Sequence, residues 1–378
     1  MIFKLTIYIN NKFMKNLLIF MPSIEGGGVE KNLFIISNFL AKKIPNTFVL
    51  TASKKFKHKF KKNIGFLTTK KNFWDNCGRR IKFLACLTIL FFFLIRNRNT
   101  LVLCFQANVY CTILCKFLNI KIIVRSNSAP SGWSQNIIKK FIFNKILKFA
   151  NLIIVNSYEF KKELKKRLDL DSTCIYNPLN KYEIIKLSKH KIKNNFFNKK
   201  SLNIINVGRF ADQKDQICLL KAINLIKNKI DIKLILIGKG DHKNIIVEYI
   251  NKNSLKNIVL LKNFSENPFP FIKSSDLFIL TSKYEGLPNV LLETIALKKM
   301  VISSDCPTGP KEILDNGKGG LLFKVGNHRE LANKIQLYFH NKKKIKKKIQ
   351  YAYKRLDRFE SNLNLKKYLY FVKKIMNI

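Results

Sequence analysis

Acidic residues are scarce in this chain. Its 378 residues include 23 Asp and Glu against 71 Lys and Arg, which gives a formal net charge of +48. Such a charge favours polyanionic partners, namely nucleic acid, anionic lipid or phosphorylated substrates. The lysine excess can equally come from mutational drift on solvent-exposed faces, because abundant Lys, Asn, Ile and Phe are also typical of proteins from AT-rich genomes. The hydrophobic fraction of 47% is enough for sizeable cores and argues against wholesale disorder.

Metal-binding patterns are missing as well. The eight cysteines occur singly, without a CxxC pair, and the five histidines form no HExxH motif. We therefore interpret the cysteines as reduced core residues of a cytoplasmic protein. The sequence predicts no bound metal and no cofactor.

No apolar run is long enough to cross a bilayer. The longest, at 83–95, has 13 residues, whereas a spanning helix needs ~20. Basic residues flank this run, so it is either a buried helix or a segment that dips into one leaflet. The helix expected at 134–149 is basic and amphipathic, and it either lies at a membrane interface or faces the core. Residues 1–13 lack the cleavage site of a secretory signal, and we hypothesise that translation starts at Met14.

Apolar strand-like runs alternate with amphipathic stretches along the chain. Continuous Val, Ile and Leu runs predict parallel strands that are covered on both faces, and repeated β-α units predict α/β domains. The basic stretch 180–200 predicts a linker, so we place one Rossmann-like domain at 14–180, a second at 200–340, and C-terminal helices that return to the first domain at 341–378. The expected strands are 17–22, 47–51, 101–105, 120–125, 151–156, 173–176, 202–207, 232–237, 258–261, 277–281, 300–304 and 320–323.

The most informative segment, SKYEGLPNVLLE at 282–293, follows the expected strand 277–281. It places Glu285 just before a helix start and Glu293 inside the helix. The first N–H groups of a helix carry a partial positive charge that suits a diphosphate without a metal. The residues that would offer this positive end are Pro288, Asn289, Val290 and Leu291.

The two carboxylates lie on either side of that helix start. At 1.5 Å per residue, Glu293 lies roughly 7–8 Å beyond the first turn. One carboxylate can then bind sugar hydroxyls while the other reaches a ribose. The alternative is a surface Glu and a mid-helix Glu without a shared task, and spacing alone leaves both open.

Two further segments follow strands. GRFADQK at 208–214 opens the second domain, and its Arg209 and Lys214 could neutralise a leaving diphosphate. Their place at the carboxyl end of a strand favours a binding role, although such residues are common in so basic a chain. GGGVEK at 26–31 lets the backbone approach a ligand, but it has neither a dinucleotide nor a P-loop signature.

Together these segments resemble the retaining glycosyltransferases of family four, which have the GT-B fold of two Rossmann-like parallel-sheet domains facing a cleft. The resemblance covers nearly the whole chain and is strongest over 202–323. The matching elements are GGGVEK at 26–31, Asn177-Pro178, GRFADQK at 208–214, the pair of Glu with seven residues between them in EGLPNVLLE at 285–293, and SSDCPTGPKEI at 303–313.

The resemblance implies a catalytic group formed by Glu285, Arg209 and Lys214. Arg209 and Lys214 would bind the donor diphosphate, Glu285 would contact the transferred sugar, and Glu293 would hold the nucleotide ribose. No residue is expected to bind a metal.

Other matched positions would complete the cleft. Gly27 and Gly28 would let the first domain close on the donor, and Arg125 would line the acceptor side. Phe264 and Pro268 lie where the family packs the base. Lys298 and Met300 stand where the family often has Gly and Pro, and a family histidine of the acceptor cleft has no counterpart here.

The resemblance implies transfer of a hexose or N-acetylhexosamine, with retention, from a nucleoside-diphosphate sugar such as a UDP-sugar. The acceptor would be a lipid-linked or membrane glycan of bacterial polysaccharide or lipopolysaccharide biosynthesis. The enzyme would lie in the cytoplasm, peripheral on the anionic inner face of the plasma membrane. A nucleoside-diphosphate-sugar epimerase of the same fold stays open. A nucleic-acid-binding protein is disfavoured, because no recognisable binding module accompanies the charge.

Overall fold

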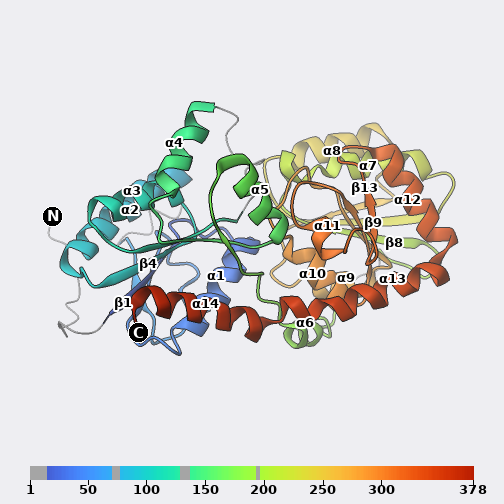
Figure 1. The fold of residues 1–378 in the computed structure, drawn as a ribbon. Helices are drawn as coiled ribbons and strands as arrows, with labels where there is room; N and C mark the ends of the chain where they lie inside the picture. Colours follow the sequence, from blue (N-terminus) through green and yellow to red (C-terminus); the bar gives the residue numbers. More distant parts are fainter. Residues whose placement is uncertain (1–14, 70–76, 128–136, 193–195) are drawn as a thin grey trace.

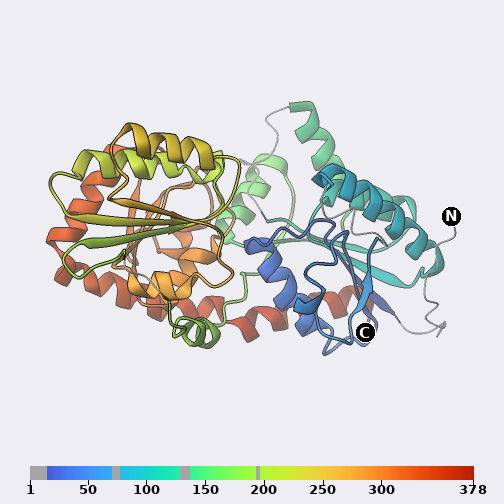
Figure 2. The ribbon, with the colours of Figure 1, turned by 180° about the vertical axis from the view of Figure 1, so that it is seen from behind.

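Two α/β domains lie side by side, and the chain passes between them twice (Figure 1). The computed structural model describes residues 15–69, 77–127, 137–192 and 196–378. Each domain contains one parallel sheet with helices on both faces, which confirms the predicted α/β class. The C-terminal helices run beneath both domains, as the view from behind also shows (Figure 2).

The first sheet has seven strands in the order β3-β2-β1-β4-β5-β6-β7. Residues of β1 such as Leu17 and Leu18 are fully buried on both faces, as expected for continuous apolar runs. The predicted strands are confirmed to within about two residues, but β3 was not predicted, because its sequence GFL begins with glycine and its residues are only half-buried, so no continuous apolar run marks it. The strands are β1 Asn16–Phe20, β2 Thr47–Leu50, β3 Gly65–Leu67, β4 Thr100–Cys104, β5 Ile122–Arg125, β6 Leu152–Val155 and β7 Thr173–Cys174.

Helices cover the two faces of this sheet in separate groups. α1 packs on one face together with the C-terminal helix α14. α2, α3, α4 and α5 cover the opposite face, to which they contribute Leu90, Cys115, Leu147 and Phe160. Their bounds are α1 Gly28–Leu40, α2 Arg79–Arg96, α3 Asn108–Phe117, α4 Ile137–Leu147 and α5 Tyr158–Leu168, and a 3₁₀ turn lies at Lys57–Lys59.

The second sheet has six strands in the order β10-β9-β8-β11-β12-β13. Its central pair, β8 and β11, is parallel, so both strands end at the same edge. The strands are β8 Leu202–Val207, β9 Ile232–Ile237, β10 Val259–Lys262, β11 Leu277–Leu280, β12 Met300–Ser304 and β13 Leu321–Phe323.

Helices pack on both faces of the second sheet. One face is covered by α7, α8 and α12, and the other by α9, α10 and the end of α13. The bounds are η4 Asp212–Lys214, α7 Gln216–Ile226, α8 Lys243–Lys252, α9 Phe269–Ser274, α10 Asn289–Ala296, α11 Pro310–Ile313, α12 His328–His340, α13 Lys342–Lys354 and η5 Arg355–Phe359.

The two segments that cross between the domains are both held by side chains. Within the expected linker, a short helix, α6 (Lys181–Leu187), packs against α9 and α10 through Ile184. α14 (Ser361–Met376) packs on the first sheet, where Tyr368 is fully buried. The Arg125 Nε donates a hydrogen bond of 2.8 Å to the Tyr368 hydroxyl.

The apolar run 83–95 lies within α2. One side of α2 is buried in the core through Cys86, Leu90 and Phe93, and the other side is exposed. The helix expected at 134–149 corresponds to α4, although residues 134–136 lie outside the described part of the chain. Among the described residues, no helix is both long enough and apolar enough to span a bilayer.

The Tyr368 hydroxyl gives a test of how α14 is anchored. Burial raises the pKa of Tyr368, so the phenol stays protonated and accepts the hydrogen bond from Arg125. Because hydrogen bonds to charged groups are the stronger ones, we expect Tyr368→Phe to lower the free energy of unfolding by about 2 kcal/mol.

The matched control is Tyr370→Phe on the same helix, because Tyr370 is exposed. We expect this change to stay within about 0.5 kcal/mol. Urea unfolding measured by circular dichroism compares the two variants. Equal stability of both would contradict the anchoring role of the Arg125–Tyr368 hydrogen bond.

Candidate active site between the two domains

The carboxyl edges of the two sheets face each other across the domain junction. The Asn289 Nδ2, at the start of α10, donates a hydrogen bond of 3.1 Å to the Gly28 carbonyl at the start of α1. Gly286, between Glu285 and α10, is a point of close approach between the domains. A β-carbon at Gly286 would lie 2.3 Å from the backbone oxygen of Asn127 in the first domain, so only glycine permits this approach.

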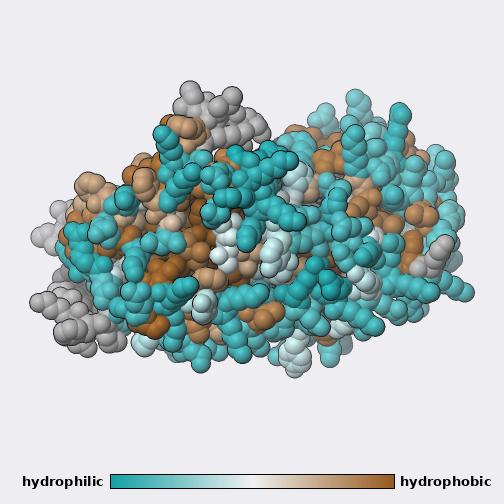
Figure 3. Space-filling view, in the orientation of Figure 1, coloured by the Kyte–Doolittle hydropathy of each residue, from teal (hydrophilic) through white to brown (hydrophobic). Residues whose placement is uncertain are grey.

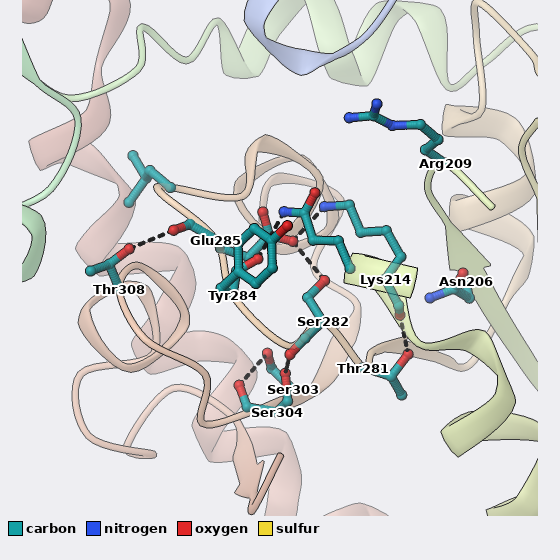
Figure 4. Close-up of polar contacts among 12 residues, drawn as sticks. Asn206, Arg209, Lys214, Thr281, Ser282, Tyr284, Glu285, Ser303, Ser304 and Thr308 are labelled. Carbon is teal, nitrogen blue, oxygen red and sulfur yellow. Dashed lines mark hydrogen bonds and ion pairs between the residues drawn. The ribbon is translucent and has the colours of Figure 1, made fainter. Parts of the chain in front are cut away.

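The junction brings Lys214 and Glu285 together. Lys214 ends η4 after β8, and Glu285 follows β11, the adjacent strand of the sheet. The Lys214 Nζ lies 2.5 Å from the Glu285 Oε1, and the Ser282 hydroxyl donates a hydrogen bond of 2.6 Å to the same oxygen (Figure 4). Because the Glu285 side chain is only 8% exposed, these partners offset the cost of burying its charge.

Arg209 lies beside this pair but is not bound to it. It is exposed just beyond the end of β8, and Figure 4 shows it apart from the Lys214–Glu285 contact. Among the described residues, no side chain forms an ion pair or a hydrogen bond with its guanidinium. Arg209 therefore keeps all its donors for a ligand.

Glu25, which directly precedes the glycine segment 26–31, interacts electrostatically with Arg209. Burial opposes the ionisation of Glu25, but the charge of Arg79, a hydrogen bond from Ser23 and the charge of Arg209 together lower its pKa. The Arg79 guanidinium lies 2.9 Å from the Glu25 carboxylate. No pattern in the sequence singles out Glu25, because this proximity arises only when the domains meet.

The second carboxylate of the motif, Glu293, is paired across the junction. Its side chain is 10% exposed, and its Oε1 lies 2.5 Å from the Nζ of Lys31 in the first turn of α1. The same ammonium group lies 4.6 Å from the centre of the Phe269 ring. Lys31 belongs to the GGGVEK segment, but the sequence predicts no role for it, because its partner is 262 positions away.

The start of α10 offers fewer free donors than expected. Pro288 has no N–H group, and the Leu291 N–H donates to the Pro288 carbonyl at 3.1 Å. Of the four predicted residues, Asn289 and Val290 keep N–H groups without a partner in the described chain. Two of the four residues that were predicted to form the positive end of α10 therefore keep a free backbone N–H group in the described chain.

The glycine loop is held by its own helix. The Glu30 carboxylate accepts a hydrogen bond of 2.9 Å from the Gly27 N–H and one of 3.3 Å from the Glu25 N–H. A β-carbon on Gly28 would lie 3.5 Å from the Asn289 side chain. Gly27 and Gly28 therefore lie at the junction, where they bring α1 close to α10.

Arg125 was expected to line the acceptor side, and the structure places it differently. The Arg125 side chain is 0% exposed. In addition to its hydrogen bond to the Tyr368 hydroxyl, it donates one of 2.7 Å to the Asn177 Oδ1. Asn177 in turn donates 2.6 Å to the Asn289 Oδ1. The prediction of an acceptor-lining arginine is wrong, because α14 covers this side chain and turns it into a structural contact.

Phe264 lies at the other side of the junction, after β10. Its ring is 42% exposed, the Lys239 Nζ lies 5.0 Å from its centre, and it faces Gly26 of the first domain. Gly26 has a φ of +89°, a conformation that favours glycine. Pro268 is the N-cap residue of α9.

A further contact between the domains was not predicted. The Glu312 carboxylate, on α11, accepts hydrogen bonds from the N–H groups of Tyr158 and Glu159, at 3.0 and 2.9 Å, and one of 2.6 Å from the Tyr176 hydroxyl. An anion at a helix start is favourable, so Glu312 stabilises the start of α5 from the opposite domain.

The cysteines and acidic residues offer no alternative chemistry at this site. Burial and the charge of Glu285 raise the pKa of the Cys306 thiol to about 12, so this thiol is not a nucleophile. In the part of the chain that the structure describes, no cluster of His, Cys, Asp and Glu could hold a metal ion.

Residues 188–355 match the family described as "Glycosyl transferases group 1". An uncharacterized glycosyltransferase of Methanocaldococcus jannaschii is 37% identical over 201 residues, which is 50% of this chain and 49% of that protein. A 4-alpha-N-acetylgalactosaminyltransferase of Campylobacter jejuni, named for a diphospho-undecaprenol acceptor, is 26% identical over 62% of this chain and 64% of its own length. A Staphylococcus aureus glycosyltransferase of capsular polysaccharide biosynthesis, CapM, is 29% identical over 40% and 42%.

The chain thus spans about half of the first of these proteins and less than two thirds of the others. Among solved structures, Anabaena HepE in complex with UDP-glucose superimposes with a TM-score of 0.78, at 18% identity, over 95% of this chain and 99% of that one. This similarity covers both domains and their arrangement. Residues 188–355 are therefore similar to the glycosyl transferases group 1 family, and the described chain has the GT-B fold.

Proposed function

We propose that this protein transfers a hexose or an N-acetylhexosamine from a UDP-linked donor to a hydroxyl of a glycan or lipid-linked acceptor, with retention at the anomeric carbon. The observation that carries the proposal is the Lys214–Glu285 pair ahead of α10, with Arg209 near it and, among the described residues, without a side-chain hydrogen-bond partner. It combines two cations and a helix N-terminus for a diphosphate with a carboxylate for the sugar.

The relatives support the donor and the setting of this reaction. HepE was solved with UDP-glucose, the Campylobacter relative is named for a lipid diphosphate acceptor, and CapM is named for capsular polysaccharide biosynthesis. We therefore place the reaction in bacterial polysaccharide or lipopolysaccharide biosynthesis. The first domain would supply the acceptor side of the cleft.

The transfer would break the bond between the anomeric carbon and the diphosphate oxygen. The acceptor oxygen would bond to that carbon from the same face, and its proton would pass to the departing diphosphate. Negative charge grows on the diphosphate as the bond breaks, so Arg209, Lys214 and the start of α10 would stabilise the transition state more than the ground state. Glu285 would fix the sugar by accepting hydrogen bonds from its hydroxyls and would keep Lys214 in place.

The Lys214 ammonium group is the most direct test of this proposal. We expect Lys214→Ala to lower kcat by about 100-fold, because it removes one pre-arranged positive charge from the leaving group. The assay follows sugar transfer from a panel of UDP-sugars to a bacterial lipid extract by mass spectrometry.

Lys283→Ala is the matched control for that change. Lys283 belongs to the same loop region but forms an exposed ion pair with Asp212, at 2.5 Å, and exposed pairs contribute little. Transfer by the Lys283 variant should stay close to wild type. Comparable rates for the Lys214 variant and the wild type would refute the assigned site.

The predicted ribose contact of Glu293 can be tested by binding alone. We expect Glu293→Gln to weaken UDP binding by about tenfold, because charge-assisted hydrogen bonds to the ribose hydroxyls become neutral ones. Isothermal titration calorimetry with UDP measures this change. Glu248→Gln, at an exposed position of α8, is the control that should bind UDP unchanged, and equal affinities of all three proteins would argue against the ribose contact.

The absence of a metal from the predicted mechanism has its own test. Because the diphosphate charge is balanced by Arg209, Lys214 and the α10 start, we expect the transfer rate to be unaffected by excess EDTA. A loss of activity that Mg²⁺ or Mn²⁺ restores would show that the cations of the protein do not suffice.

A further inference from the structure

Three helices of the first domain carry apolar side chains on the side that faces away from the sheet. In α3 the exposed residues recur at the spacing of one helix face, and Phe117 is 79% exposed. We name this surface the apolar face and define it by its exposed residues, which are Ile81, Leu84, Phe92 and Ile95 of α2, Tyr110, Ile113 and Phe117 of α3, and Phe141, Ile142 and Phe149 of α4 and its end.

The three helices lie together on one face of the first sheet. α3 contacts both α2 and α4, and the Lys116 Nζ of α3 lies 4.8 Å from the Phe149 ring beyond α4. Figure 3 shows brown, apolar side chains gathered over the end of the molecule that carries α3 and α4. Monomeric soluble proteins rarely expose so many large apolar side chains in one region, so the apolar face points to a partner.

The electrostatic character of this region is one-sided. Residues 76–158, which include α2, α3 and α4, contain no Asp or Glu and carry twelve basic residues. These are Arg79, Arg80, Lys82, Arg96, Arg98, Lys116, Lys121, Arg125, Lys139, Lys140, Lys145 and Lys148. A partner that covers the apolar face must therefore offer both negative charge and an apolar interior.

Exposed basic residues lie at the ends of the apolar helices or between their apolar residues. Arg96 and Arg98 follow the apolar run of α2, and Lys116 stands next to Phe117. The Lys145 Nζ lies 4.5 Å from the Phe141 ring. Helices with this pattern lie in the headgroup region of a bilayer, with aromatic and aliphatic side chains dipping below the phosphates.

We propose that the apolar face docks the protein on an anionic lipid bilayer, without crossing it. A second copy of the chain is disfavoured, because two such faces would bring like charges together, among them Arg96, Lys116 and Lys145 of each copy. Nucleic acid would match the charge but not the exposed Phe, Ile and Leu side chains. A bilayer with anionic headgroups satisfies both features.

The docking would place the cleft next to the membrane. α2, α3 and α4 start at the carboxyl edge of the first sheet, which is the edge that meets Gly286 and Asn289 of the second domain. A lipid-linked acceptor could then reach the junction from the bilayer surface. Only this last step rests on the proposed function, whereas docking itself is independent of catalysis.

The test is co-sedimentation of the full chain with vesicles at low salt. We expect binding to vesicles of equal parts phosphatidylcholine and phosphatidylglycerol, and none to phosphatidylcholine alone. The double variant Ile113→Ser, Phe117→Ser should bind the anionic vesicles about tenfold more weakly, because it removes inserted apolar side chains. The double variant Lys116→Glu, Lys145→Glu should lose about tenfold or more through charge.

Matched controls come from the second domain. Leu225 and Ile245 are exposed to a similar degree as Ile113, so Leu225→Ser, Ile245→Ser should sediment like the wild type. Lys252→Glu, Lys256→Glu changes the net charge by the same amount away from the face and should retain most of the binding. Failure of the wild type to sediment, or equal losses in face and control variants, would overturn the proposal.

Further measurements distinguish membrane docking from misfolding, self-association and loss of the donor site. Circular dichroism should show that the face variants stay folded, because the changed residues are exposed. Size-exclusion chromatography should show the same size for wild type and face variants, and a change from dimer to monomer would assign the face to a second copy instead. UDP binding by calorimetry should be the same in all variants, so a failure to dock is distinguishable from a failure of the donor site.

Discussion

One continuous chain of hydrogen bonds runs across the junction of the two domains. Arg125 donates to the Tyr368 hydroxyl and to the Asn177 side-chain oxygen, Asn177 donates to Asn289, and Asn289 donates to the Gly28 carbonyl. The chain links α14, the first sheet, the crossing segment and the start of α10 to the start of α1. Because hydrogen bonds between buried groups are stronger than those in water, this chain holds the start of α10 against the glycine loop.

Lysines balance the two buried carboxylates of the junction. Glu285 is paired with Lys214 from its own domain, whereas Glu293 is paired with Lys31 from the other domain. Burying a carboxylate is costly unless it is paired, so each lysine offsets part of the cost of burying its Glu partner. Lys214 and Lys31 are therefore two lysines with a structural role at the junction.

The two proposals place different functions on different surfaces of the same architecture. The polar loops meet at the carboxyl edges of the sheets, because parallel strands buried on both faces leave only their ends for polar chemistry. The helices that leave the first sheet at this edge expose apolar side chains on their outer side. A donor site and a membrane contact can therefore adjoin each other without sharing residues, and a lipid-linked acceptor would connect them.

The sequence by itself determined the two parallel sheets and the segments that meet at their edges. Runs of Val, Ile and Leu bury both faces of a strand, so β1, β8 and β11 could be predicted, whereas the half-buried β3, with the sequence GFL, has no such run. The family resemblance implied that Glu285 and Lys214 act on the same donor, and the structure brings them together because they follow adjacent parallel strands.

Only the tertiary structure decided which side chains meet across the junction. Arg125 forms a buried contact with Tyr368, which lies 243 positions later in the sequence. Lys31 pairs with Glu293, which lies 262 positions later. Local spacing carries no information on such pairs, because they depend on how two folded domains pack. The sequence also did not determine whether α2, α3 and α4 expose apolar side chains. The same apolar pattern occurs in a helix that is covered on both sides and in one that is covered on one side only.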